Sequence, residues 1–255
     1  MNRIDNLFKN KPSDVLTIYF TAGYPNLEDT GSIILGLAKA GVDLIEIGMP
    51  YSDPLADGPV IQASSKEALK NGMNLDLLFD QLKGIRSKTQ VPLVLMGYYN
   101  QVIQYGLEPF CKRANQVGVD GVILPDLPLN EYKKQCAPLF KQHELTCTFL
   151  VTPSSTDERI REIDAASSGF LYAVSSHSIT GGDSVNNLSE YGNRLAALNL
   201  NNPIQVGFGI HDAKSFQAAT AIANGGIIGS AFIKALSKEE LLDNKIRSFV
   251  EGVRV

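Results

Sequence analysis

A glutamate stands in the middle of a short apolar run, where a charged side chain is costly. Glu46 lies between Ile45 and Ile47 in an expected strand over residues 43–49. Side chains alternate between the two faces of a strand, so Glu46 points away from its apolar neighbours. Burial would raise its pKa toward that of a usable general acid or base. The alternative is an ion pair with a buried cation, but the neighbouring expected strands contain no Lys or Arg. We therefore expect Glu46 to be a catalytic acid–base.

The loop that follows this strand carries two further carboxylates, Asp53 and Asp57. Turn chemistry alone explains acidic residues beside Pro and Gly, so a structural role and a functional role both stay open. Several carboxylates at one strand end could form an acid–base pair or bind a metal. Metal binding is disfavoured because none of the histidines, His143, His177 and His211, accompanies them. We expect no metal.

Glycines recur at the ends of the last three expected strands. They follow the sixth strand at 180–182 and end the seventh at 207–209, and they stand at the start and the end of the eighth at 225–226 and 229–230. Glycine lets the backbone approach a ligand closely, and backbone N–H groups can hold an anion without Lys or Arg. A single glycine loop would be an ordinary turn. Three loops at consecutive strand ends predict a phosphate site.

Aromatic and long apolar side chains gather at the same strand ends. Packing inside the molecule explains any one of them, but together they could line a flat apolar pocket beside the phosphate. The residues concerned are Tyr19, Ile61, Met96, Tyr98, Tyr99, Ile123 and Tyr172.

The elements that must position these residues are short apolar runs that alternate with amphipathic segments. The runs are apolar on both faces, as in a buried parallel sheet. The expected strands cover residues 16–21, 43–49, 92–98, 121–125, 146–152, 169–175, 204–208 and 226–229.

Eight strand–helix units in about 250 residues predict a (β/α)8 TIM barrel. We expect one domain over residues 1–255. A doubly wound open sheet is the alternative, but it would leave two units unused. Ile4, Leu7 and Phe8 follow a helical spacing, which predicts a short N-terminal helix over the barrel floor. In such barrels the catalytic residues lie at the carboxyl ends of the strands.

Composition narrows the function further. The 255 residues are 44% hydrophobic and 20% charged, which excludes a largely disordered chain. A net charge of −4 argues against nucleic acid as a partner. Three cysteines without metal or disulfide spacing indicate reduced thiols, and hence a cytoplasmic protein. Neither a signal peptide nor a membrane-spanning run is expected.

One motif is far more specific than the rest. The run EIGMPYSDPLADGPVIQ, from Glu46 to Gln62, resembles the signature of the tryptophan synthase alpha subunit family. Stretches at 20–25, 96–100, 124–128, 180–181, 206–210 and 229–231 also match that family in order and spacing. The resemblance covers essentially the whole chain.

The resemblance implies a TIM barrel that cleaves indole-3-glycerol phosphate to indole and glyceraldehyde 3-phosphate by a retro-aldol reaction. It implies that Glu46 is the general acid–base and that Asp57 binds the indole N–H. By the same resemblance, Tyr172 positions Glu46 and the substrate, and Thr180 lies in a loop that closes over the site and fixes Asp57.

The resemblance also assigns the two ends of the substrate. It implies an indole pocket formed by Tyr19, Ile61, Met96, Ile123 and Ile227. The implied phosphate-binding residues are Gly181, Phe208, Gly209, Gly229 and Ser230.

A protein partner is implied as well. Ser52 and Asp53 match the rim that faces a beta subunit in an alpha2beta2 heterotetramer. The beta subunit carries pyridoxal phosphate and receives the indole, whereas this chain is expected to need no cofactor. Two departures, Ser176 and Ser178, affect the closing loop. They leave open a stand-alone indole-releasing lyase, while a non-catalytic phosphate-binding barrel that activates a partner is disfavoured by the intact Glu46 and Asp57.

Overall fold

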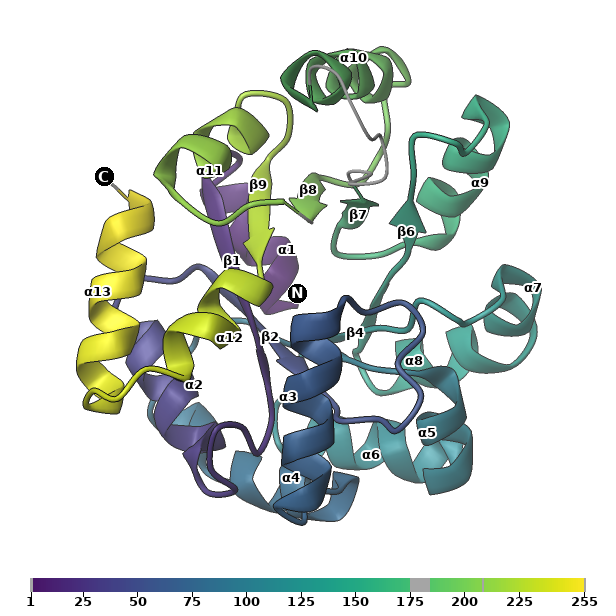
Figure 1. Cartoon of the computed structure of the whole chain (residues 1–255). Helices are drawn as coiled ribbons and strands as arrows, with labels where there is room; N and C mark the ends of the chain where they lie inside the picture. Colours follow the sequence, from purple (N-terminus) through teal and green to yellow (C-terminus); the bar gives the residue numbers. More distant parts are fainter. Residues whose placement is uncertain (1, 175–183, 208, 255) are drawn as a thin grey trace.

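The computed structural model describes residues 2–174, 184–207 and 209–254. Parallel strands form its centre and helices surround them (Figure 1). The strands are β1 (Val15–Thr21), β2 (Leu44–Gly48), β3 (Leu93–Met96), β4 (Gly121–Ile123), β5 (Thr146–Thr148), β6 (Leu150–Val151), β7 (Leu171–Val174), β8 (Ile204–Gly207) and β9 (Gly225–Ile228).

The strands close into a barrel. Their order is β5-β4-β3-β2-β1-β9-β8-β7-β6, and every pairing is parallel. Only Phe149 separates β5, which pairs with β4, from β6, which pairs with β7. The nine strands therefore occupy eight positions, since β5 and β6 are two pieces of one. The predicted TIM barrel is confirmed, and the open doubly wound sheet is wrong.

Helices and helical turns surround the strands, and most of them connect one strand to the next (Figure 1). They are α1 (Arg3–Asn10), α2 (Asp29–Lys39), α3 (Pro59–Lys70), α4 (Leu75–Leu82), the 3-10 turn η1 (Ile85–Ser87), α5 (Tyr99–Tyr105), α6 (Leu107–Gln116), α7 (Leu129–Glu131), the π-helical turn η2 (Tyr132–Cys136), α8 (Ala137–Gln142), α9 (Asp157–Ala166), α10 (Ser184–Ala197), α11 (Ala213–Thr220), α12 (Ser230–Leu236) and α13 (Leu242–Arg254). The strands and helices alternate along all the described residues. The limits of the predicted single domain, residues 1 and 255, stay predictions.

The predicted N-terminal helix closes the barrel floor. Ile4 and Phe8 of α1 are buried and pack with the lumen side chains of the strands. The ring of Phe8 lies 6.0 Å from that of Phe170, measured between centroids. Because this end of the lumen is filled by apolar side chains, a ligand can enter only from the opposite end.

An ion-pair cluster holds α1 against the strands beside the floor. Asp120 is buried and accepts a hydrogen bond of 2.9 Å from Arg3 and one of 2.8 Å from the backbone N–H of Leu93. It also pairs with Arg86, which in turn donates to the Gly118 carbonyl. Through these contacts a single buried carboxylate ties three segments together.

Two strand glycines make room for tyrosines at the other end of the lumen. A Cβ at Gly48 would collide with the hydroxyl of Tyr19, and a Cβ at Gly207 would collide with the ring of Tyr172. Both rings therefore lie directly against the backbone of a neighbouring strand. Any larger residue at these positions would displace an aromatic side chain of the lumen.

We predict that Gly207→Ala lowers the free energy of unfolding by about 1–3 kcal/mol, because the added methyl group overpacks the lumen against Tyr172. Chemical denaturation measures this change. Gly252→Ala is the matched control: nothing lies within 4 Å of a Cβ at Gly252, a helical position in α13. Equal stability changes in the two variants would contradict the proposed packing.

Candidate active site

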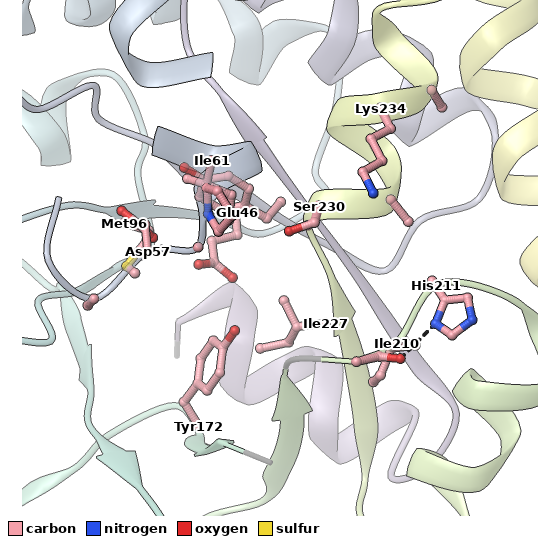
Figure 2. A pocket seen from close by; sticks show the side chains of 18 of the residues that line it. Glu46, Asp57, Ile61, Met96, Tyr172, Ile210, His211, Ile227, Ser230 and Lys234 are labelled. Atoms are coloured by element: carbon pink, nitrogen blue, oxygen red, sulfur yellow. Dashed lines mark hydrogen bonds between the residues drawn. The ribbon is translucent and has the colours of Figure 1, made fainter. Parts of the chain in front are cut away.

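A cavity of about 720 Å³ opens at the carboxyl ends of the strands. Its walls come from β1, β2, β3, β6, β7 and β9, from the loops after β2, β4 and β8, and from α3, α12 and α13. Glu46 and Asp57 lie on one side of it, and Ser230, Lys234 and His211 lie on the other (Figure 2). The cavity therefore has an acidic side and a basic side.

Glu46 sits on the acidic side, inside the barrel. It belongs to β2, is only 2% exposed, and its Oε2 atom has no hydrogen-bond partner among the described residues. Burial raises the pKa of Glu46 to about 8, and the nearby Asp57 contributes to the same increase. This carboxyl group therefore carries a proton at neutral pH and can donate it to a ligand.

Asp57 lies in the loop after β2 and is a stronger acid than Glu46. Burial raises the pKa of Asp57 to about 6, while a hydrogen bond from Tyr98 opposes this increase. The Tyr98 hydroxyl donates to Asp57 Oδ2 over 3.0 Å and accepts from the Ala56 N–H over 2.9 Å. Two carboxyl groups of one cavity thus differ in proton affinity, the arrangement that separates a proton donor from an anion.

The contacts that hold Asp57 were not found from the sequence. Tyr98 was expected in the apolar pocket, but its hydroxyl instead holds the Asp57 loop. Tyr51 stacks on Tyr98 with ring centroids 5.1 Å apart and accepts a hydrogen bond from Asn100. Gln101 donates to the Pro50 carbonyl over 2.8 Å. The motif from 96 to 100 was the one available signal, because it placed Tyr98 and Asn100 at a strand end.

Most of the expected indole-pocket residues line the cavity. Tyr19, Ile61, Met96 and Ile227 are among its walls. Tyr172 of β7 is another, and its hydroxyl points toward Glu46 (Figure 2). Ile123 is an exception, since it is fully buried in the lumen core and does not line the cavity.

The basic side includes three of the expected phosphate residues. Gly209, Gly229 and Ser230 line the cavity there. Gly209 has a φ of 79°, a left-handed backbone conformation that favours glycine. Lys234 and Lys238, which sequence analysis missed, line the same side, and neither forms an ion pair within the described part of the chain.

Three expected site residues, Thr180, Gly181 and Phe208, lie outside the described residues, as do Ser176 and Ser178 of the closing loop.

The Asp57 loop also forms an exposed rim beside the cavity. Ser52 and Asp53 are exposed there, as expected for partner-facing residues. Leu55, which sequence analysis did not single out, is 92% exposed in the same loop. An apolar side chain that exposed can be covered by a protein partner.

No group of three or more His, Cys, Asp or Glu residues that could hold a metal occurs among the residues described. Likewise, no helix of residues 2–174, 184–207 and 209–254 combines the length and apolarity needed to span a membrane.

Comparison with known proteins shows the family of this chain. The family model described as "Tryptophan synthase alpha chain" matches residues 6–253. The tryptophan synthase alpha chain of Flavobacterium johnsoniae is 52% identical over the full length of both chains. That of Christiangramia forsetii is 51% identical over 100% of this chain and 99% of its own.

Solved structures give the same result. The tryptophan synthase alpha subunit of Legionella pneumophila superposes with a TM-score of 0.90 at 32% identity, covering 100% of this chain and 97% of its own. A chain of M. tuberculosis tryptophan synthase in its aminoacrylate-bound form gives a TM-score of 0.85 at 30% identity, covering 99% and 98% of the two chains. With its barrel, its two carboxyl groups and these full-length matches, the chain belongs to the tryptophan synthase alpha chain family.

Proposed function

We propose that Glu46 and Asp57 carry out the reaction of this family, the cleavage of indole-3-glycerol phosphate to indole and glyceraldehyde 3-phosphate. The observation that carries this proposal is the pair of carboxyl groups with different proton affinities on one side of a largely apolar cavity. The reaction breaks a carbon–carbon bond, and indole is a poor leaving group as a carbanion. Its C3 atom must therefore be protonated before the bond breaks.

Glu46 is suited to supply that proton. With its pKa raised to about 8, it carries a proton at neutral pH and can pass it to C3. The resulting carboxylate then accepts the proton of the side-chain hydroxyl next to the breaking bond. As that hydroxyl becomes the aldehyde carbonyl, the bonding electrons return to the ring. Glu46 ends the cycle protonated, as it began.

Asp57 supplies the complementary charge. Protonation at C3 leaves positive charge on the ring nitrogen, which an anion beside the N–H stabilises. With its pKa raised only to about 6, Asp57 is ionised at neutral pH. The Tyr98 hydroxyl holds this carboxylate in place before the charge develops, so little reorganisation is needed during the reaction.

The rest of the cavity matches the two ends of the substrate. Apolar walls that include Ile61 and Met96 suit the indole ring, and Tyr172 reaches toward Glu46 between the two ends. At the basic side, the backbone of Gly209 and Gly229 and the Lys234 ammonium group suit the phosphate. The roles of Thr180, Gly181 and Phe208 rest on the family resemblance alone.

The chemistry described here needs no cofactor in this chain, since every step moves a proton between the substrate and a carboxyl group. Pyridoxal phosphate belongs to the beta subunit in this proposal. The free, buried thiols Cys111, Cys136 and Cys147 support a cytoplasmic location.

Glu46→Gln should lower the rate of indole release from indole-3-glycerol phosphate by at least about 10²–10⁴-fold, because the amide cannot donate or accept the proton. Single-turnover assays measure this loss. The free energy of unfolding of Glu46→Gln should exceed that of the wild-type chain at neutral pH, because the wild-type chain must take up a proton at Glu46 in order to fold and the variant need not. The sign follows from the pKa: Glu46 ionises more readily when unfolded, near 4.5, so its carboxylate opposes folding increasingly between about pH 4.5 and 8.

Glu251→Gln is the matched control for this experiment, since Glu251 is exposed on α13 and does not line the cavity. Turnover in Glu46→Gln comparable with that of the control would rule out the assigned acid–base role.

The pH profile of kcat/KM should be bell-shaped, with limbs near pH 6 and pH 8. Activity rises as Asp57 ionises and falls as Glu46 loses its proton. Stopped-flow measurement of indole release across pH 5–10 tests this shape. Asp57→Asn should release indole much more slowly and should lose the limb near pH 6, which would agree with the assignment of that limb to Asp57. A profile without a limb near pH 8 would refute the role of protonated Glu46.

The exposed rim supports a protein partner as part of the same function. We propose that a tryptophan synthase beta subunit docks over Asp53 and Leu55, in an alpha2beta2 heterotetramer. Both residues lie in the loop that also carries Asp57, so a partner that holds the rim would also hold the catalytic carboxylate. Docking would favour the state aligned for cleavage.

The isolated chain should therefore release indole slowly and respond to a saturating beta subunit with a clear increase in rate. Asp53→Ala should weaken that increase and leave the isolated rate nearly unchanged, because Asp53 has no part in bond breaking. Asp243→Ala, an exposed carboxylate at the start of α13, is the matched control. A fast isolated chain that gains nothing from the partner would favour the stand-alone lyase, and equal harm with and without partner would place Asp53 in the catalytic site.

A further inference from the structure

Three buried hydroxyl groups form a chain that ends at the cavity wall. The Tyr19 hydroxyl lies 3.4 Å from the Thr21 hydroxyl, which lies 2.7 Å from that of Ser64. The Ser64 hydroxyl donates to the Ile61 carbonyl over 2.9 Å. All three side chains are at most 6% exposed, so no bulk water competes for these contacts.

The direction of each hydrogen bond in this chain follows from counting protons. Ser64 has one hydroxyl proton and uses it on the Ile61 carbonyl, so Ser64 must accept from Thr21. Thr21 has then used its own proton and must accept from Tyr19. The Tyr19 oxygen is left with lone pairs and no proton to offer. Toward the cavity it is therefore a hydrogen-bond acceptor only.

The position of this acceptor is set by the barrel. Tyr19 pairs in register with Glu46 on the neighbouring strand, and its hydroxyl lies against Gly48 at the carboxyl end of β2. The acidic groups that influence it are Asp57, Glu46 and Tyr98. Burial raises the pKa of Tyr19 well above its usual value, so the phenol stays neutral and its oxygen keeps the acceptor role throughout the pH range of the reaction.

We propose that the Tyr19 hydroxyl is a specificity group that shares with Asp57 the hydrogen bond donated by the ring N–H of the substrate. The inference rests on the proposed function and extends it. A ring N–H can only donate, so it matches a group that can only accept, whereas an aliphatic hydroxyl would fit a donor or an acceptor equally well. Tyr19 is thus more than the apolar wall that the sequence suggested, and the hydroxyl chain keeps its proton away from the ligand.

A pair of ligands tests the proposal on the intact chain. One is an indol-3-yl alkyl phosphate, and the other is its benzothiophene counterpart, in which sulfur replaces the N–H. Calorimetry gives the affinity ratio, which is the affinity for the indole ligand divided by that for the benzothiophene ligand. It is measured in the wild-type chain and in Tyr19→Phe, which keeps the ring and removes the acceptor. The indole ligand should bind about 3- to 10-fold more weakly to Tyr19→Phe, as expected for one neutral hydrogen bond, while the benzothiophene ligand should be unaffected.

A second variant tests the chain without touching the cavity wall. In Ser64→Ala, Thr21 loses its acceptor and can donate to Tyr19, which then turns its own proton toward the ligand. The affinity ratio should therefore be lower in Ser64→Ala than in the wild-type chain. Adding Ser64→Ala to Tyr19→Phe should leave the affinity ratio of Tyr19→Phe unchanged. Tyr191→Phe is the matched control and should leave the ratio unchanged, because it removes a buried tyrosine hydroxyl that has no hydrogen-bond partner in the described structure.

The outcomes separate the two claims. Equal weakening of both ligands in Tyr19→Phe, or an unchanged ratio, would overturn the inference and leave the proposed function intact. If Ser64→Ala also changed the affinity ratio in the Tyr19→Phe background, the change could not act through the Tyr19 hydroxyl. That result would overturn the hydroxyl chain and the inference built on it. Failure of both ligands to bind the wild-type chain would overturn the proposed function and this inference together.

Discussion

The site depends on keeping two carboxyl groups away from bulk water at the open end of an apolar lumen. Removing a carboxylate from water favours its protonated form, and a second carboxylate nearby strengthens that preference. Both effects raise the pKa of Glu46, whereas the hydrogen bond from Tyr98 partly offsets the increase that burial causes in the pKa of Asp57. The difference between the two environments provides a proton donor and an anion from chemically similar side chains. No cationic group is needed to create it.

The two ends of the barrel differ in how their buried charged groups are paired. At the floor, α1 fills the lumen and Asp120 gathers Arg3 and Arg86, so buried charge is fully paired. At the open end, Glu46 Oε2 has no partner among the described residues. An unpaired buried polar group lowers stability. The paired charges and apolar packing thus lie at the floor, and the unpaired carboxyl oxygen lies where the cavity opens.

The barrel was predictable because its signal is local and repeated. Eight apolar runs separated by amphipathic segments leave few alternatives, and only the break at Phe149 and the strand ends differ from expectation. Glu46 was predictable for the same reason, since a carboxylate between two isoleucines is conspicuous in any strand. Most pocket residues then followed from the family resemblance and the position of the strand ends.

The contacts between distant segments were not predictable. Tyr98 bonds Asp57 across 41 residues of sequence, and Thr21 meets Ser64 across 43. Such partners are chosen by how a loop or helix packs after the barrel has closed, and the sequence pattern carries no signal for that choice. Ile123 shows the same limit, because a strand position alone does not tell whether a side chain reaches the cavity or stays in the core beneath it.

The protonation state of Glu46 is the most direct test of this account, and carbon-13 NMR of its carboxyl group measures it. The signal is assigned by its absence in Glu46→Gln and followed from pH 4 to pH 10. The account predicts a neutral carboxyl group at pH 7 that titrates with a pKa near 8, and a lower midpoint in Asp57→Asn, where the neighbouring charge is removed. A midpoint near 4.5, the ordinary pKa of a glutamate, would contradict it.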